Sequence, residues 1–146
     1  MSLMSVWTAV KPPAILTILG NVVGPFVFGL VFAEVYALAI GRAEFDPYHF
    51  ALLGLPPLLA IDVVAAIWAG YRIVAQGVGG MTASALGGLV MGVLGNTVIL
   101  PLHLALYGSD SLAGYVTGSA ASCVASLVLG AVGGYFAQPT PRRELG

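Results

Sequence analysis

The chain has 146 residues, of which 59% are hydrophobic and 8% charged, with a formal net charge of −1 and a mean hydropathy of +1.00. A soluble globular domain carries about 25% charged residues, so this composition excludes an ordinary soluble domain and predicts an integral membrane protein. The small net charge gives no electrostatic reason to expect nucleic acid as a partner. We therefore expect a single all-α domain over residues 1–146, surrounded by membrane lipids.

Four apolar stretches are long enough to cross a bilayer, which requires about 20 residues in a helix. The predicted spans cover approximately residues 13–40, 49–73, 82–107 and 111–137. Ahead of the first span, residues 1–12 carry Trp7 near Lys11, a pattern typical of a segment that lies at the membrane surface. Pro12 and Pro13 would then begin the first helix, because proline is tolerated in the first turn. The predicted fold is a compact bundle of four transmembrane helices.

Small residues recur at every fourth position of the last span. They are Gly114, Gly118, Ser122, Ser126, Gly130 and Gly134. Side chains four apart share one helical face, so this helix should carry a shallow groove along its whole length. The first span repeats the spacing with Gly20 and Gly24, and the third span repeats it with Gly88 and Gly92. Such faces let membrane helices approach closely, which predicts a bundle packed through them, with the last helix as its spine.

Four polar residues fall inside the predicted spans. They are Glu34, Asp62, Asn96 and His103. Ionisable groups are costly in a membrane, which makes these residues candidates for a functional site. At about 1.5 Å per helical residue, counting puts Glu34 and His103 near the outer interface, with Asp62 and Asn96 near the middle. By the same counting, Asn21 lies nearer the cytoplasmic side.

These residues allow three interpretations. In the first, Glu34, Asp62, Asn96 and His103 form a path for protons or cations, since carboxylates and histidine can both exchange protons. In the second, Glu34 and His103 lie at the wet boundary, and Asp62 accepts hydrogen bonds from Asn96 or from a serine of the last span. In the third, His103 is the axial ligand of a haem or chlorin, although no second intramembrane histidine could pair with it. Otherwise we expect neither a cofactor nor a metal site.

Basic residues predict the orientation. With four spans, Lys11, Arg72, Arg142 and Arg143 lie on the same side of the membrane as the termini, and Arg42 lies on the other. Loops rich in lysine and arginine remain in the cytoplasm. Both termini are therefore expected to be cytoplasmic.

Two short segments, Ala69-Gly70-Tyr71-Arg72 and Ala85-Leu86-Gly87-Gly88, give the layout a general likeness to other proteins. With four spans and a glycine-rich third span, the chain resembles the small four-helix membrane proteins of bacteria. The resemblance implies the bacterial cytoplasmic membrane as its location, and it implies no particular function.

The sequence contains no catalytic signature. No nucleophile, base and orienting residue can be recognised together, and no glycine cluster precedes a phosphate-binding lysine, so we expect no enzyme. Our principal interpretation is a non-catalytic accessory or assembly subunit, which packs against other membrane-protein subunits or against itself. The alternative is a small oligomeric ion- or proton-coupled transporter or channel that uses Asp62 and Glu34. A groove filled within one chain, with Asp62 facing a cavity, would favour the transporter, and an outward-facing groove would favour the subunit.

Overall fold

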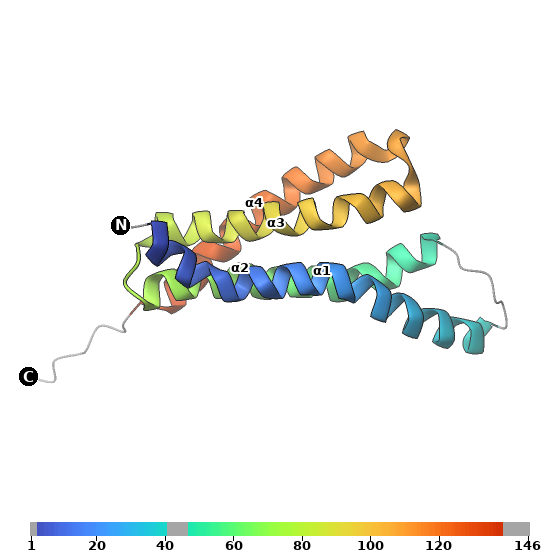
Figure 1. Cartoon of the computed structure of the whole chain (residues 1–146), viewed down its shortest axis with the longest axis horizontal. Coiled ribbons are helices and arrows are strands. Elements are labelled where there is room, and N and C mark those ends of the chain that lie inside the picture. The colour runs from blue at the N-terminus through green and yellow to red at the C-terminus, as the bar shows by residue number, and fades with distance from the viewer. Residues whose placement is uncertain (1–2, 41–46, 139–146) are drawn as a thin grey trace, which may run out of the picture.

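The computed structural model describes residues 3–40 and 47–138, which form four α-helices, one short 3-10 helix and no strand. In chain order these are α1 (Leu3–Ile40), α2 (Pro47–Ala75), α3 (Met81–Tyr107), η1 (Ser109–Ser111) and α4 (Leu112–Phe136). The helices run up and down, so the starts of α1 and α3 meet the ends of α2 and α4 at one end of the bundle (Figure 1). The all-α prediction is thus confirmed for the described residues.

The first helix begins earlier than the sequence predicts. Residues 3–12 are the first turns of α1 and not a separate surface segment, so Pro12 and Pro13 lie inside the helix. Pro13 has no N–H to donate to the carbonyl of Ala9, four residues earlier. The side chain of Arg72 in α2 replaces that donor, because its Nε donates a 2.9 Å hydrogen bond to the Ala9 carbonyl. Ala9 itself is fully buried, so the start of α1 belongs to the bundle.

Three helices are long and apolar enough to cross a membrane by length and composition. The candidate spans are Met4–Pro25, Met81–Tyr107 and Ser109–Phe136, found among the described residues. Their outward side chains are apolar as well: Leu19, Val90 and Val124 are 56%, 51% and 65% exposed. A helix that is apolar on its outer as well as its inner face is typical of a membrane span. These features support integration of the bundle in a membrane.

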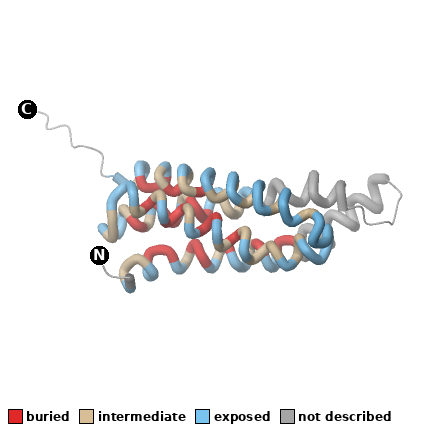
Figure 2. The backbone as a smooth tube through the Cα atoms, turned by 90° about the horizontal axis from the view of Figure 1, so that it is seen from above, coloured by how far each residue is buried: buried red, intermediate tan, exposed pale blue. Residues whose placement is uncertain are grey.

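The tightest packing lies in the half of the bundle near the chain termini, where Figure 2 shows most of the buried residues of the described part. Gly130 of α4 stands at the centre of this region. A methyl group added at Gly130 would lie 2.5 Å from the carbonyl oxygen of Ser84 and 2.8 Å from Cα of Gly88, both in α3. One added at Gly70 of α2 would lie 2.7 Å from the carbonyl carbon of Gly130. Three helix backbones therefore meet at Gly130.

Other predicted small residues line neighbouring contacts. A methyl group at Gly92 would lie 2.7 Å from Ser126 Oγ, and one at Gly20 would lie 2.6 Å from Cγ2 of Ile61. Gly24 is buried in α1, and Gly134 is buried against α3. In this half of the bundle, the absence of side chains lets the helices approach closely.

The described residues fill the groove of α4 over only part of its length. A methyl group added at Gly114 or Gly118 would meet no other atom of the described residues within 4 Å, and both glycines are exposed. The reason lies in α3, which carries small residues up to Gly95 but has Ile99 and Leu102 further along. The α3–α4 hairpin diverges from α1 and α2 in the half of the bundle farther from the termini (Figure 1).

Candidate functional site: a pocket at Asp62

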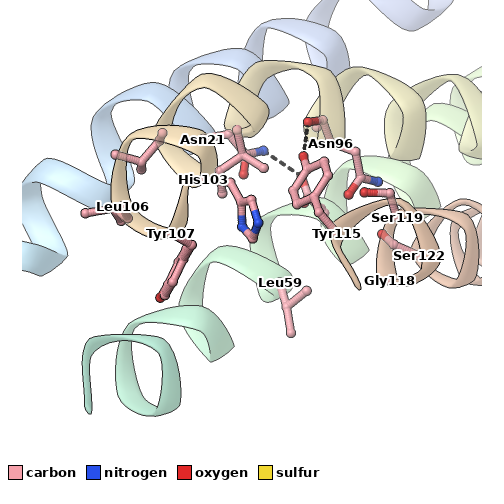
Figure 3. A pocket seen from close by; sticks show the side chains of 14 residues that line it. Asn21, Leu59, Asn96, His103, Leu106, Tyr107, Tyr115, Gly118, Ser119 and Ser122 are labelled. Atoms are coloured by element: carbon pink, nitrogen blue, oxygen red, sulfur yellow. Dashed lines mark hydrogen bonds between the residues drawn. The ribbon is translucent and has the colours of Figure 1, made fainter. Parts of the chain in front are cut away.

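A pocket of about 460 Å³ opens where the α3–α4 hairpin diverges from α1 and α2. All four helices contribute to its lining, and Figure 3 shows side chains from each of them directed around one space. The lining residues are Asn21, Leu59, Asp62, Gly95, Asn96, Ile99, Leu102, His103, Leu106, Tyr107, Tyr115, Gly118, Ser119 and Ser122. The pocket thus joins three of the four predicted polar candidates to part of the glycine face of α4.

The inner end of the pocket is formed around Asp62, which is partly buried. Asn21 Nδ2 of α1 donates a 2.8 Å hydrogen bond to Asp62 Oδ1 and a 3.0 Å bond to the Thr17 carbonyl of its own helix. On α3, Gly95 leaves room for the carboxylate, since a methyl group there would lie 2.9 Å from Asp62 Oδ1. The glycine thus permits a carboxylate to sit against the backbone of a neighbouring helix.

The partner of Asp62 differs from the predicted one. We expected Asn96 or a serine of the last span, whereas the structure gives Asn21 as the hydrogen-bond donor. The error follows from the start of α1: counting from residue 13 put Asn21 too near the cytoplasmic side, but the helix begins at Leu3. Asn21 therefore lies at the level of Asp62.

The charge of Asp62 has no basic side chain of the described residues beside it along the helices. Arg72 lies ten residues further along α2, and Lys11 lies ten residues before Asn21 in α1. At about 1.5 Å per residue, each is displaced by about 15 Å along its helix. An ionised carboxylate in apolar surroundings is costly unless a cation or proton neutralises it. Neither Lys11 nor Arg72 can therefore supply a direct counter-charge to Asp62.

Asn96 and Tyr115 form one wall of the pocket. Asn96 Nδ2 donates a 2.7 Å hydrogen bond to the Gly92 carbonyl and approaches Cys123 Sγ at 3.8 Å. The Tyr115 hydroxyl of α4 donates to the backbone carbonyl of Asn96 on α3, a bond drawn in Figure 3. This interhelical bond holds the Tyr115 ring on the pocket wall.

His103 lies nearer the α3–α4 turn. Its Nε2 is 2.9 Å from Ser111 Oγ, and that hydroxyl also donates a 2.8 Å bond to the Gly108 carbonyl. The imidazole stacks in tilted geometry near Tyr107 and Tyr115, with ring centroids 5.0 and 4.4 Å away. Haem or chlorin ligation through Nε2 would have to displace Ser111 and separate these rings. The arrangement therefore gives the haem interpretation no support.

The structure brings Asp62, Asn96 and His103 to one pocket, as a shared path would require. Glu34 lies in α1, in a part whose side chains are outside the described residues. From the sequence, no role was assigned to Asn21 or Tyr115. Two signals in the sequence could have pointed to them: Asn21 is an amide inside a predicted span, and Tyr115 is an aromatic residue on a glycine-rich helix. Within the described ranges, no three His, Cys, Asp or Glu side chains come together as a metal site.

No protein-family model, curated protein or solved structure matches this chain. The function therefore has to be argued from the chemistry of the pocket.

Proposed function

We propose that this chain is a small four-span transporter that moves a cation, or a proton-coupled solute, through the pocket at Asp62. The observation that carries the proposal is the position of Asp62: a carboxylate at the inner end of an open intramembrane pocket, with no lysine or arginine of the described residues beside it. Acidic residues inside membrane spans that face a cavity are characteristic of substrate and ion pathways. Of the two functions considered from the sequence, this geometry favours the transporter.

The packing around the pocket supports one-sided access. Towards the termini, Ala66, Ala69 and Met91 are fully buried and fill the space beyond the pocket. Gly88 and Gly130 bring α3 and α4 together in the same region. A carrier that works by alternating access must hold its site open on one side and closed on the other. The closed half here consists mainly of small side chains, which bring the helix backbones into close contact.

Polar groups on the open side give a moving charge successive contacts. From Asp62 they continue through Asn96 and the Tyr115 hydroxyl to His103, and the His103–Ser111 contact lies at the α3–α4 turn. Each side chain can give or accept a hydrogen bond. The lining thus supports desolvation of a cation in steps.

The test is flux in liposomes that contain the purified protein. Under an imposed cation gradient, proton and cation movement would be followed with entrapped dyes. Asp62→Asn should abolish flux because the amide cannot carry charge, while Asp110→Asn, at an exposed position near the α3–α4 turn, should retain it. Absence of flux in the unmodified protein, or full flux in Asp62→Asn, contradicts the proposal.

A second candidate function is the accessory or assembly subunit, including a homo-oligomer. The open positions Gly114 and Gly118 favour it, because no atom of the described chain covers them. Small residues four apart form contact faces between membrane helices. A shift to a smaller particle in native-detergent sizing of Gly114→Leu would support this function, and an unchanged particle size would count against it.

The proposed location is the bacterial cytoplasmic membrane, with both termini in the cytoplasm. Lys11 and Arg72 support this orientation, since both lie towards the end of the bundle where α1 begins and α2 ends. Basic residues accumulate on the cytoplasmic side. In this orientation the pocket opens away from the cytoplasm.

A further inference from the structure

We infer that the pocket binds a monovalent organic cation with an apolar body, whose charge pairs with Asp62 and whose body lies against Tyr115 and the aliphatic lining. The inference rests on the proposed function, in that it takes the Asp62 pocket as the ligand site, and it adds the class of ligand. Three features carry it: the number of charges, the lining of the cavity and the coordination available at its inner end.

The charge of the pocket selects a single positive charge. Among the described residues of the lining, Asp62 is the one acidic side chain, and its Oδ1 accepts the hydrogen bond from Asn21. Because the asparagine is neutral, that bond orients the carboxylate without neutralising it. An ammonium group placed at Asp62 would neutralise the carboxylate, which is favourable where the surrounding dielectric constant is low. A dication would leave an excess positive charge in the membrane.

The body of the ligand follows from the remaining lining, which is mainly apolar. Leu59, Ile99, Leu102 and Leu106 contribute aliphatic surface to a cavity of about 460 Å³. Pockets that hold small organic molecules have volumes of about 300–1,000 Å³ and are lined in the same way. The cavity thus has the size and surface of a site for an organic molecule.

Aromatic rings add attraction for a cation. Tyr107 and Tyr115 both line the pocket, and the Tyr115 ring is held by its hydroxyl bond to the Asn96 carbonyl. Aromatic faces attract ammonium groups within about 6 Å of the ring centroid, and desolvation strengthens the attraction. A quaternary or tertiary ammonium with an aromatic or branched group would pair its charge with Asp62 and place its apolar group against the tyrosine rings.

Coordination at the inner end disfavours an inorganic ion. A hard cation such as Ca²⁺ requires about 6–8 oxygen ligands, and Mg²⁺ requires octahedral coordination. Asn21 directs its amide nitrogen, not its oxygen, towards Asp62. No cluster of three His, Cys, Asp or Glu side chains exists among the residues that the structure describes. One carboxylate in a cavity with a mainly apolar lining suits a large, weakly hydrated cation better.

The experiment measures binding by isothermal titration to the full chain in a nonionic detergent. The probe is benzyltrimethylammonium, which carries one charge and an apolar ring. Tetramethylammonium tests charge without the ring, benzyl alcohol tests the ring without charge, and sodium chloride tests an inorganic ion. We expect benzyltrimethylammonium to bind on the order of tenfold more tightly than each of the others. Equal affinity for sodium or for benzyl alcohol overturns the inference.

Matched variants locate the site. Gly118 lines the pocket and Gly114 does not, although both lie on α4 with open space around them. Gly118→Leu should therefore fold and weaken binding on the order of tenfold, while Gly114→Leu should fold and bind normally. Asp62→Asn should remove binding, and Asp110→Asn should preserve it. Binding that survives both Gly118→Leu and Asp62→Asn overturns the inference.

Failure of this inference and failure of the proposed function are separable. If Asp62-dependent flux occurs in liposomes without any binding of benzyltrimethylammonium, the ligand class is wrong and the transporter stands. If the probe binds at Asp62 but no flux of protons, inorganic cations or the probe occurs, the ligand class stands and the transporter is wrong.

Discussion

Asn21 and Asp62 are joined by a 2.8 Å hydrogen bond that links α1 to α2 at the inner end of the pocket. The donor is neutral, so the bond fixes the orientation of the carboxyl group without placing a positive charge beside it. The same amide also donates to the Thr17 carbonyl, which ties its position to the backbone of α1. A binding group that is oriented but not neutralised by its own chain is suited to a cationic ligand.

Removal of the donor should destabilise the bundle. Asn21→Leu leaves the Asp62 carboxylate without its interhelical hydrogen bond, and we expect the free energy of unfolding to fall by about 1.5–3 kcal/mol. Asp62→Asn keeps an acceptor oxygen for Asn21 and should change stability by less than about 1 kcal/mol. Thermal unfolding in detergent measures both variants.

Thr97→Val is the control for this prediction. Its hydroxyl bonds to the Val93 carbonyl of the same helix at an exposed position, so its removal should change stability by no more than about 0.5 kcal/mol. Equal losses of unfolding free energy in Asn21→Leu and Thr97→Val would show that the interhelical bond stabilises the protein no more than an exposed bond within one helix.

Glycine positions of α4 should respond oppositely to the same change. Gly130→Ala forces a methyl group to within 2.5 Å of the Ser84 carbonyl oxygen and should cost about 1–3 kcal/mol of stability. Gly118→Ala meets open space and should be neutral or stabilising by up to about 1 kcal/mol, because alanine is the better helix former. Unfolding midpoints of the two variants decide the matter, and equal tolerance would mean that the three-helix contact at Gly130 does not form.

Arg72 and Pro13 should be coupled through the Ala9 carbonyl. Arg72→Met removes the donor to a buried carbonyl that Pro13 leaves unpaired, and the expected loss is about 1–3 kcal/mol. Pro13→Ala restores the helical N–H, so the same arginine change should cost much less in that background. A double-mutant cycle measured by thermal unfolding gives the coupling. A coupling energy of zero would rule out this role for Arg72.

Orientation is tested with reporter fusions. A reporter active only in the cytoplasm should work after Gly146, and one active only outside should work within residues 44–47. The expectation rests on the distribution of lysine and arginine. If a reporter that is active only outside the cytoplasm worked after Gly146, the termini would lie outside. The pocket would then open towards the cytoplasm.

Much of the fold could be predicted from the composition of the chain and the spacing of its residues. Apolar length predicted the helices, and counting residues predicted that Asp62 and Asn96 lie near each other, as their place in one pocket lining shows. The start of α1 could not be predicted, because two prolines inside a helix normally mark its beginning. Here the helix continues through them with Arg72 as an external donor to Ala9, and such a tertiary contact leaves no local pattern in the sequence.

The α4 groove shows a second limit of prediction from the sequence. Its small residues are equally spaced from Gly114 to Gly134, so periodicity alone cannot distinguish the half that packs from the half that remains open. The difference depends on the facing helix, which is small at Gly88 but bulky at Ile99 and Leu102. The pocket follows from this mismatch between two helices and not from the residues of either one.

The most direct test of an intramembrane cation site is the carboxyl signal of Asp62 itself. Protein labelled with ¹³C at aspartate Cγ should give three signals, from Asp46, Asp62 and Asp110. The Asp62 signal is assigned by its loss in Asp62→Asn. Titration with benzyltrimethylammonium should shift the Asp62 signal and leave that of Asp110 unchanged, with tetramethylammonium less effective. An Asp62 signal that does not move while the probe is bound, or that moves no more than that of Asp110, would contradict the account.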